Sequence, residues 1–379
     1  MRVVLLAGEA SGDLLGAAIV RALRARNPDI ECLGITGPQM RAAGCSSLGD
    51  IEALSLMGIF EILRELPRLV RFRREMREAI IAAKPDIVVG IDAPDFNLAL
   101  EGQLRERGLR CVHVVSPTIW AWRPKRRFKI ARNCDAILCL YPFEPECYAD
   151  TGLRADFIGH PLADELNDSV TPAQARAQLG LDPEQPVLGV LPGSRRGEVA
   201  RLMPDYAQAA RLLAEKHPGI RAVVPVAHEG LREAIAAHTQ DAPGLEWTLL
   251  EGQSREVMRA SDLLLLTSGT VTLEALLLGR PMVVAYRASA ATIWLLRTFR
   301  MVRTAHFSLP NVLTGERTVP ELLQDQVSAE ELVAELEPLW TDPQARAYQM
   351  RRFAEGRAQL ARNAGARAAE TIEALAGRA

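Results

Sequence analysis

The sequence has few of the features that mark disulfide-stapled, metal-dependent or membrane-spanning proteins. Its six cysteines lie in the first half of the 379 residues, mostly inside apolar runs, and show no Cys-x-x-Cys spacing. We therefore expect reduced, buried thiols rather than a disulfide framework or a zinc site. There is no Asp-x-Asp pair and no histidine cluster with ligand spacing, so no metal site is predicted. No apolar run reaches the roughly 18 residues of a membrane-spanning helix.

A strong net charge is also missing. Lys and Arg number 45 against 47 Asp and Glu, so no overall charge favours nucleic acid and any basic surface must be local. Apolar residues make up 48% of the chain, which is enough for large cores, and 379 residues exceed one ordinary domain. Two domains are therefore expected. The N-terminal run Met1–Ala7 is too short for a signal peptide and is predicted to be a strand.

Short β-rich runs alternate with longer helical patterns, such as Leu14–Arg24 and Leu98–Arg107, along the chain. Strands this apolar are expected to be buried on both faces of a parallel sheet, as in doubly wound α/β folds. The predicted strands are Val3–Leu6, Glu31–Ile35, Ile87–Ile91, Cys111–Val115, Ala136–Leu140 and Ala155–Ile158 in the first half, and Val187–Leu191, Arg221–Val226, Trp247–Leu250, Leu263–Thr267 and Met282–Ala285 in the second.

A polar stretch, Asp164–Pro172, separates the two series and is predicted to be a linker. Each series is predicted to form a Rossmann-like doubly wound domain. Ligands bind such sheets at the carboxyl ends of their strands, so the two domains are expected to face each other across a cleft. We predict a first domain over residues 1–165, a second over residues 166–345, and a helical segment, 346–379, that packs back toward the first domain.

The first predicted strand leads through Gly8–Asp13 directly into a helix. Two glycines allow close backbone approach, and the N–H groups at the helix start, near Ser11 and Gly12, suit an anion or a hydroxyl-rich ligand. Local sequence alone favours a plain tight turn in which Ser11 or Asp13 caps the helix. The loop is neither Gly-x-Gly-x-x-Gly nor a Walker A loop, which argues against NAD and ATP, and no cofactor is expected.

A second loop, Asp92–Asn97, follows the third predicted strand. Pro94 disfavours helix at the residue before it, so Asp92 and Asp95 are predicted to lie in an irregular loop at the carboxyl edge of the sheet. A carboxylate there is accessible enough to act as a general base. Capping of the next helix by Asp95 or Asn97 is an equally good interpretation on these grounds.

In the second half, Pro192–Glu198 follows a predicted strand. Its Gly193-Ser194 turn and the neighbouring Arg195 and Arg196 suit a diphosphate, because a guanidinium can bind two phosphate oxygens at once. The alternative is a solvated surface turn, which fits one of the two arginines.

Ser268-Gly269-Thr270 is another glycine-containing turn between strand and helix. Glu274 lies one helical turn beyond Thr270, where it can bind a ribose while the helix start receives phosphate. A local capping contact is the alternative for Glu274.

The sequence thus has four such loops, each at the carboxyl end of a predicted strand, which is hard to ascribe to coincidence. Together they predict a diphosphate site in which arginines and helix N-termini take the place of magnesium.

Seven segments, taken in order from Gly8 to about Gln324, carry a family resemblance. They are Gly8–Asp13, Gly90–Asn97, Ser116–Arg123, Gly159–Pro161, Leu191–Arg195, Ser268–Glu274 and Ser308–Asn311. Together they resemble the lipid-A-disaccharide synthase family, which has the two-domain glycosyltransferase-B (GT-B) fold. One departure is His306-Phe307, where the family pattern has an aromatic residue followed by a branched aliphatic one.

The resemblance implies an inverting, metal-independent glycosyltransferase of lipid A and lipopolysaccharide biosynthesis. It would join UDP-2,3-diacylglucosamine to 2,3-diacylglucosamine 1-phosphate through a β-1,6 link and release UDP. The first domain would face the acceptor and the membrane, and the second would bind the UDP-sugar.

The resemblance also implies roles for single residues. Asp95 would be the general base for the acceptor's 6-hydroxyl, and Arg195 would bind the diphosphate. Asn311 would be needed for activity, Glu274 would bind the ribose, and Glu9 would lie in the loop that faces the acceptor. The other positions predicted to bind substrate are Ser11, Gly12, Asp92, Asn97, His160, Gly193, Ser194, Ser268, Gly269 and Thr270.

Acylated substrates require a membrane-facing surface. Leu54–Arg77 interleaves apolar residues with six arginines, a pattern typical of helices on anionic bilayers. A core-packing helix with a solvated arginine face is the alternative. Ile293–Arg303 is a further apolar and basic stretch, and Trp120–Arg127 is interpreted as a lipid or phosphate contact, or as tryptophan packing, rather than a nucleic-acid site. We expect a cytoplasmic protein bound peripherally to the cytoplasmic face of the inner membrane.

Two other functions stay open. A UDP-sugar 2-epimerase of the same fold would need the Gly-Ser-Arg loop and the ribose acid, but neither Leu54–Arg77 nor an acceptor. A catalytically silent nucleotide- or RNA-binding protein would explain Trp120–Lys129 but leave Asp92 and Asp95 without a role.

Overall fold

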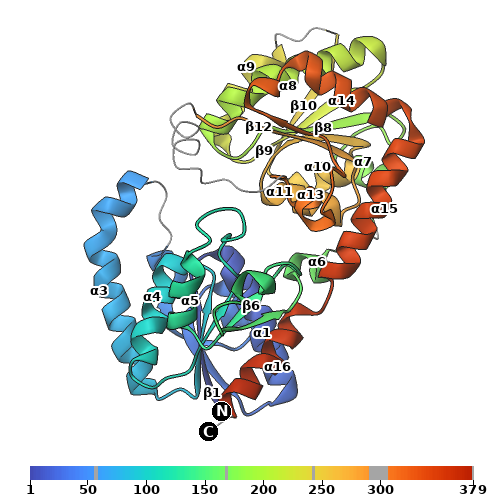
Figure 1. Ribbon diagram of the computed structural model, residues 1–379. Helices are drawn as coiled ribbons and strands as arrows, with labels where there is room; N and C mark the ends of the chain where they lie inside the picture. Colours follow the sequence, from blue (N-terminus) through green and yellow to red (C-terminus); the bar gives the residue numbers. More distant parts are fainter. Residues whose placement is uncertain (55–58, 167–169, 241–243, 290–305, 378–379) are drawn as a thin grey trace. The chain divides into compact units, whose positions relative to one another are not determined.

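The structure is a computed structural model that describes residues 1–54, 59–166, 170–240, 244–289 and 306–377 (Figure 1). The segment Ile293–Arg303 lies outside the described residues, as do residues 55–58 and the side chains of residues 59–65 in the amphipathic segment. The chain forms two compact units, one of Met1–Asp164 with Gln359–Ala379 and one of Glu165–Ala358. No helix in the described part is long and apolar enough to cross a membrane.

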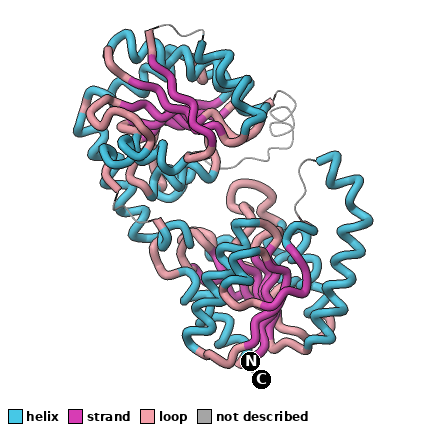
Figure 2. The backbone as a smooth tube through the Cα atoms, turned by 180° about the vertical axis from the view of Figure 1, so that it is seen from behind, coloured by secondary structure: helices cyan, strands magenta, loops and turns pink. Residues whose placement is uncertain are grey.

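The first unit is built on a parallel sheet of seven strands in the order β3-β2-β1-β4-β5-β6-β7. Its central strands are wholly buried because helices cover both faces (Figure 2). The strands are β1 Arg2–Ala7, β2 Glu31–Thr36, β3 Ser46–Asp50, β4 Ile87–Ile91, β5 Cys111–Val114, β6 Ala136–Cys139 and β7 Arg154–Phe157. The helices are α1 Ala10–Arg26, α2 Pro38–Ala42, α3 Ile59–Ala83, α4 Pro94–Arg105, α5 Arg126–Asn133, α6 Pro161–Glu165 and α16 Ala364–Ala376, with short 3-10 turns at Ile51–Ala53 and Pro145–Tyr148.

The second unit repeats this plan with six parallel strands in the order β10-β9-β8-β11-β12-β13. The strands are β8 Val187–Leu191, β9 Arg221–Val226, β10 Glu246–Glu251, β11 Leu263–Thr267, β12 Met282–Tyr286 and β13 Glu321–Leu323. The helices are α7 Pro172–Gln178, α8 Arg196–Lys216, α9 Arg232–Gln240, α10 Ser254–Ala260, α11 Thr270–Leu277, α13 Leu309–Thr314, α14 Ala329–Thr341 and α15 Pro343–Leu360, with 3-10 turns at Glu229–Leu231 and Gln324–Gln326.

Each sheet has a point where the strand order reverses, and the four predicted loops follow the strands at these two points. In the first unit the reversal lies between β1 and β4, whose ends are level because Ala7 pairs with Ile91. In the second it lies between β8 and β11, where Leu191 pairs with Leu266. Doubly wound sheets bind ligands at the carboxyl ends of the strands beside such a reversal.

The last helix returns the chain to the first unit. There α16 packs on α1 so closely that a Cβ atom on Gly365 would lie 2.9 Å from the backbone oxygen of Ala18. Asp164 accepts hydrogen bonds from the N–H groups of Asn363 and Ala364 at the start of this helix. The chain enters the first unit at Gln359 rather than at residue 346, because α15 is one continuous helix of 18 residues.

Two strands lie outside the sequence prediction. Both β3 and β13 are short edge strands, and β3 has the polar sequence Ser-Ser-Leu-Gly-Asp with no fully buried residue. Both strands are only partly buried, so their sequences lack the continuous apolar runs that mark the central strands.

Candidate functional site

The loops after β1 and β4 touch at the strand reversal of the first unit. A Cβ atom on Gly8 would lie 2.2 Å from the Cβ of Ala93, so only glycine allows the two loops to come this close. Asp92 and Ala93 have φ angles of +52° and +43°, which turn the chain sharply. Pro94 then begins α4, since its fixed φ suits the first helical position.

Asp95 therefore lies in the first turn of α4 and not in an irregular loop, which corrects that prediction. It does not cap the helix either, because the N-cap is Ala93 and no side chain bonds there. The Asp95 side chain is 94% exposed, and its Oδ1 accepts a hydrogen bond of 2.5 Å from Nη2 of Arg126 on α5. Asp95 is thus an accessible carboxylate in the first turn of a helix at the ligand-binding edge of the sheet.

Asn97 has a different task from the predicted substrate contact. Its side chain is fully buried, and its amide donates to the carbonyl oxygens of Leu6, Ile91 and Asp92 at 3.0, 3.2 and 2.8 Å. The amide thus ties the start of α4 to the ends of β1 and β4. Asn97 fixes where Asp95 stands and does not reach the surface itself.

The Gly8–Asp13 loop places two polar side chains outward and one inward. Glu9 and Ser11 are exposed, and Glu9 is the N-cap of α1 without a side-chain capping bond. Gly12 is buried beneath them. Asp13 does not cap its own helix: its carboxylate is buried and accepts bonds from the N–H groups of Gly37, Gln39 and Met40, so it caps α2.

His160 follows β7 and is buried. Its Nδ1 accepts a 3.2 Å bond from the N–H of Leu162, and its ring lies 5.6 Å from that of Tyr141. Burial lowers the pKa of His160 to about 4, so the imidazole is neutral near pH 7. Its position supports a structural role more than contact with a substrate.

Sequence reasoning did not single out the buried carboxyl of Glu144, which lies between β6 and the turn Pro145–Tyr148. One carboxyl oxygen accepts hydrogen bonds of 3.0 Å from the N–H groups of Leu140 and Tyr141. Burial nevertheless raises its pKa to about 8. Only a three-dimensional structure shows that this glutamate is buried, because its neighbours in sequence include both apolar and polar residues and do not indicate a buried position.

In the second unit, the loop after β8 bends at Gly193, where φ is +116°. A Cβ atom there would lie 2.5 Å from a carboxylate oxygen of Glu198. That carboxylate accepts bonds from the N–H groups of Ser194 and Arg195 and from Nη1 of Arg195. Ser194 and Arg195 are exposed, the latter by 82% of its side chain, so this loop presents a guanidinium, paired with Glu198, at the start of α8.

The loop after β11 has the same form at the start of α11. Gly269 and Thr270 are exposed, and Ser268 is partly exposed and donates a long bond to the carbonyl of Phe307. Glu274 is half-buried one turn into α11, and its carboxylate lies 3.2 Å from Nε of Arg255 on α10. The two loops stand on neighbouring strands, β8 and β11, so their helix starts can share one ligand.

Asn311, which the resemblance implies is needed for activity, is buried. Its amide Nδ2 donates to the carbonyl of Val319 at 2.9 Å, and its Oδ1 accepts the N–H of the same residue at 2.8 Å. This pair ties α13 to the segment that leads into β13. A loss of activity on changing Asn311 would therefore act through the position of this loop.

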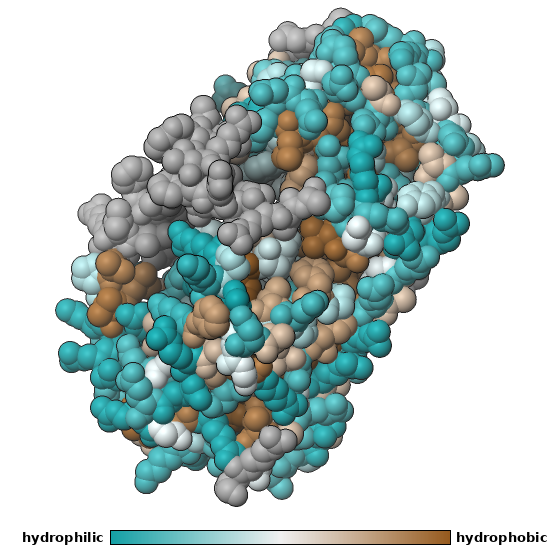
Figure 3. Space-filling view, viewed as in Figure 1, coloured by the Kyte–Doolittle hydropathy of each residue, from teal (hydrophilic) through white to brown (hydrophobic). Residues whose placement is uncertain are grey.

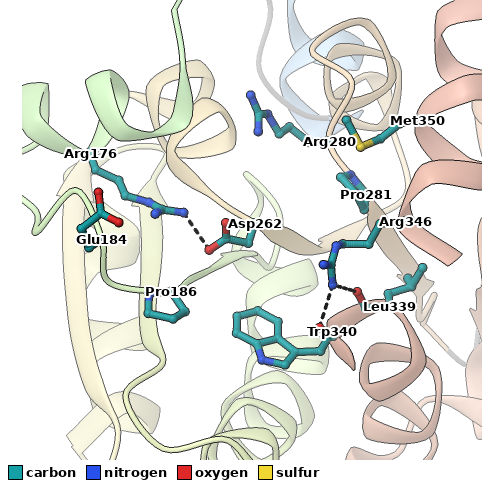
Figure 4. A pocket seen from close by; sticks show the side chains of 10 residues that line it. All are labelled: Arg176, Glu184, Pro186, Asp262, Arg280, Pro281, Leu339, Trp340, Arg346 and Met350. Atoms are coloured by element: carbon teal, nitrogen blue, oxygen red, sulfur yellow. Dashed lines mark hydrogen bonds and ion pairs between the residues drawn. The ribbon is translucent and has the colours of Figure 1, made fainter. Parts of the chain in front are cut away.

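A pocket of about 400 Å³ lies in the second unit away from these loops (Figure 4). Pro186, Asp262 and Pro281 line it just before β8, β11 and β12, so it opens at the amino ends of the strands. Two of its arginines are already engaged: Arg176 lies 2.7 Å from Asp262, and Arg346 donates to the carbonyls of Leu339 and Trp340 near the end of α14. Its position is opposite to the edge where doubly wound sheets bind nucleotides.

Two other kinds of site would need a cluster of metal-binding side chains or a reactive thiol. Within the described residues, no three His, Cys, Asp or Glu side chains gather to hold a metal ion. All six cysteines are free, and burial raises the pKa of Cys32 to about 11 and that of Cys45 to about 12. Such thiols stay protonated and unreactive at neutral pH.

Comparison with solved structures defines the class to which this architecture belongs. UDP-GlcNAc 2-epimerase from Neisseria meningitidis, bound to UDP-GlcNAc, superposes with a TM-score of 0.67 at 15% identity, covering 99% of this chain and 100% of that one. The glycosyltransferase of kitacinnamycin superposes with a TM-score of 0.63 at 18% identity, covering 99% and 98%. Two Rossmann-like units with parallel sheets are thus the α/β GT-B fold.

Sequence comparison then gives the family. Residues 3–375 match the family described as lipid-A-disaccharide synthetase. The lipid-A-disaccharide synthase of Xanthomonas campestris pv. campestris (strain 8004) is 46% identical over 376 residues, or 99% of this chain and 86% of that protein. The chain belongs to the lipid-A-disaccharide synthase family. It is a glycosyltransferase that uses a UDP-sugar donor and a sugar acceptor in lipid A disaccharide synthesis.

Proposed function

We propose that this glycosyltransferase joins UDP-2,3-diacylglucosamine to 2,3-diacylglucosamine 1-phosphate, with inversion at the donor's anomeric carbon. The observation that carries the proposal is the exposed carboxylate of Asp95, fixed at the strand reversal of the first unit. Family membership supplies the general reaction, and the position of Asp95 supplies its base.

In this mechanism Asp95 takes the proton of the acceptor's 6-hydroxyl as the hydroxyl oxygen attacks the anomeric carbon. The bond from that carbon to the UDP oxygen breaks, and its electron pair leaves with UDP. An α-linked donor gives a β-linked product in this single displacement. Positive charge develops on the sugar ring and negative charge on the departing diphosphate in the transition state.

The donor is proposed to bind the second unit. The starts of α8 and α11 receive the diphosphate, and the exposed guanidinium of Arg195 binds the leaving group in exchange for its ion pair with Glu198. Glu274 accepts the ribose hydroxyl groups. With these groups in place of a metal ion, we propose that turnover needs no magnesium, so EDTA should leave the rate unchanged.

The acceptor and product also imply a lipid surface, and we propose peripheral binding at the cytoplasmic face of the inner membrane through α3. One face of this helix packs into the core of the first unit through Phe72, Met76 and Ile80. Leu66 and Val70 remain 50% and 48% exposed, beside the exposed Arg68 and Arg71. In Figure 3, apolar side chains interrupt the polar surface of the first unit.

One assay tests the reaction. Purified protein is incubated with UDP-2,3-diacylglucosamine, with and without the acylated sugar phosphate, and the products are separated by chromatography. Disaccharide 1-phosphate and UDP in equal amounts, formed only with acceptor, support the proposal. A changed UDP-sugar without acceptor would instead show an epimerase, the activity of the fold relative that superposes above.

A further inference from the structure

The proposed base is engaged by a neighbouring cation. Oδ1 of Asp95 is bonded at 2.5 Å to Nη2 of Arg126, whose side chain is only 20% exposed while that of Asp95 is 94% exposed. A general base needs its oxygen within hydrogen-bond reach of the hydroxyl whose proton it takes. For this oxygen to serve, the guanidinium must first move to another anion.

The helix that carries Arg126 is strongly cationic. Residues 123–133 contain six Lys and Arg and no Asp or Glu. Arg127 is held by both carboxylate oxygens of Asp150. Lys129, three residues beyond Arg126 and so on the same face of α5, is exposed and has no partner among the described residues.

Asp95, Arg126 and Lys129 line one small depression between α4 and α5, with Leu98 and Ile130 as its apolar walls. The guanidinium of Arg126 has five N–H donors in a planar fork, and its described bond to Asp95 uses one of them. A second anion can therefore be bound beside Asp95 without moving either helix.

We propose that Arg126 and Lys129 bind the phosphate of the acceptor, and that this phosphate draws Arg126 away from Asp95 and thereby frees the base. The inference rests on the proposed function. A phosphate monoester carries a charge of about −1.5 to −2 and three acceptor oxygens, so it competes well against a single carboxylate for a guanidinium. The molecule that supplies the reacting hydroxyl thus also releases the group that deprotonates it.

The alternative is a structural role, in which Arg126 only ties α5 to α4. The two roles differ in one measurable respect. A structural arginine affects all acceptors equally, whereas a phosphate-binding arginine affects only acceptors that carry the phosphate.

The experiment compares kcat/KM for 2,3-diacylglucosamine 1-phosphate and for the same sugar with a free 1-hydroxyl, with UDP-2,3-diacylglucosamine as donor. The wild type should prefer the phosphorylated acceptor by roughly 10- to 100-fold for each charge-assisted bond. Arg126→Ala should reduce this preference to within a few-fold, and Lys129→Ala should reduce it in part. Arg126→Ala should also use the phosphate-free acceptor at least as well as the wild type does, because Asp95 is then free.

Arg132→Ala, a change of an exposed arginine on the same helix, is the matched control and should keep the wild-type preference. If thermal unfolding shows that Arg126→Ala is unstable, Arg126→Gln is used instead, because it keeps a polar side chain with a hydrogen-bond donor but removes the charge. The acceptor preference of Arg126→Gln then decides. An equal loss with both acceptors in these variants overturns the inference while the proposed reaction stands. Absence of disaccharide from the wild type with either acceptor overturns the proposed reaction itself.

Discussion

At the scale of single residues, the side chain of Asp95 has the clearest chemical consequence. Asp95→Asn preserves shape but cannot accept the proton, so turnover should fall by roughly 10²- to 10⁴-fold while UDP affinity is unchanged. Steady-state kinetics and calorimetric titration with UDP check the two parts. Asp29→Asn changes an exposed aspartate of the same unit and serves as control. Near-normal turnover in Asp95→Asn would assign the base to Asp92 or Glu9.

The buried carboxyl of Glu144 predicts a dependence of stability on pH. Burial raises its pKa from 4.5 to about 8, so the folded protein keeps a proton that the unfolded chain releases in this range. The free energy of unfolding should therefore fall as the pH rises from about 4.5 through about 8. His160, whose pKa burial lowers to about 4, acts in the opposite direction below about pH 6.5.

Thermal midpoints between about pH 6.5 and 8 isolate the Glu144 contribution. Glu144→Gln cannot ionise and should flatten this part of the profile, whereas Glu146→Gln, a change of its exposed neighbour, should leave it sloping. If the thermal midpoint of Glu144→Gln fell with pH as steeply as that of the unchanged protein, a group other than Glu144 would be responsible for the pH dependence.

At the scale of elements, the position of α4 depends on Asn97. Asn97→Ala leaves three carbonyl oxygens of the strand ends without their donor, which should lower the free energy of unfolding by about 1–3 kcal/mol. The start of α4, which carries Asp95, is then no longer fixed to the strand ends. We therefore expect a larger fold-decrease in kcat than in the affinity for UDP. Asn133→Ala at the end of α5 is the control. An unchanged kcat in Asn97→Ala would show that the hydrogen bonds of Asn97 do not position the catalytic residue.

The amphipathic helix α3 gives another prediction. Replacing Leu66 and Val70 by Ser removes exposed apolar surface and should reduce flotation with anionic liposomes, without lowering thermal stability. Association of the unchanged protein should weaken in high salt, since each basic residue near the surface contributes about 1 kcal/mol. Met76→Ser, a change of a buried residue, should instead destabilise the fold. If the variant with both Leu66→Ser and Val70→Ser floated with liposomes as the unchanged protein does, this face of α3 would be excluded as the membrane contact.

The elements also show how far sequence reasoning reaches. Apolar strands such as Ile87–Ile91 were predictable because a buried parallel strand must be apolar on both faces. The loops at the strand reversals followed from them. Asn97 was predicted to bind substrate or to cap a helix, and Asn311 to be needed for activity. Both side chains are buried, because sequence does not tell whether a polar side chain bonds substrate or backbone. The pairing of Asp95 with Arg126 joins two helices and has no local signature.

At the scale of the whole molecule, the two units should differ in their dependence on α16. Gly365→Leu places a side chain against the backbone of Ala18 and should cost about 1–3 kcal/mol in the first unit. Ala374→Leu, on the exposed face of the same helix, is the control. Calorimetric melting should show a lower transition temperature for Gly365→Leu. UDP affinity should be unchanged, because the loops that we propose bind the donor belong to the second unit. A loss of UDP affinity would contradict this division.

The chain returns to the first unit at Gln359, and this has a consequence for the order in which the two units are completed during synthesis. The second unit is an insertion in the first: all of its residues, Glu165–Ala358, are synthesised before α16 exists to cover α1. The nascent first unit therefore displays a bare apolar helix face until α16 has been made and has emerged from the ribosome. A chain released without residues 359–379 would hold every residue of the second unit but an incomplete first unit, a species that chaperones and proteases can recognise.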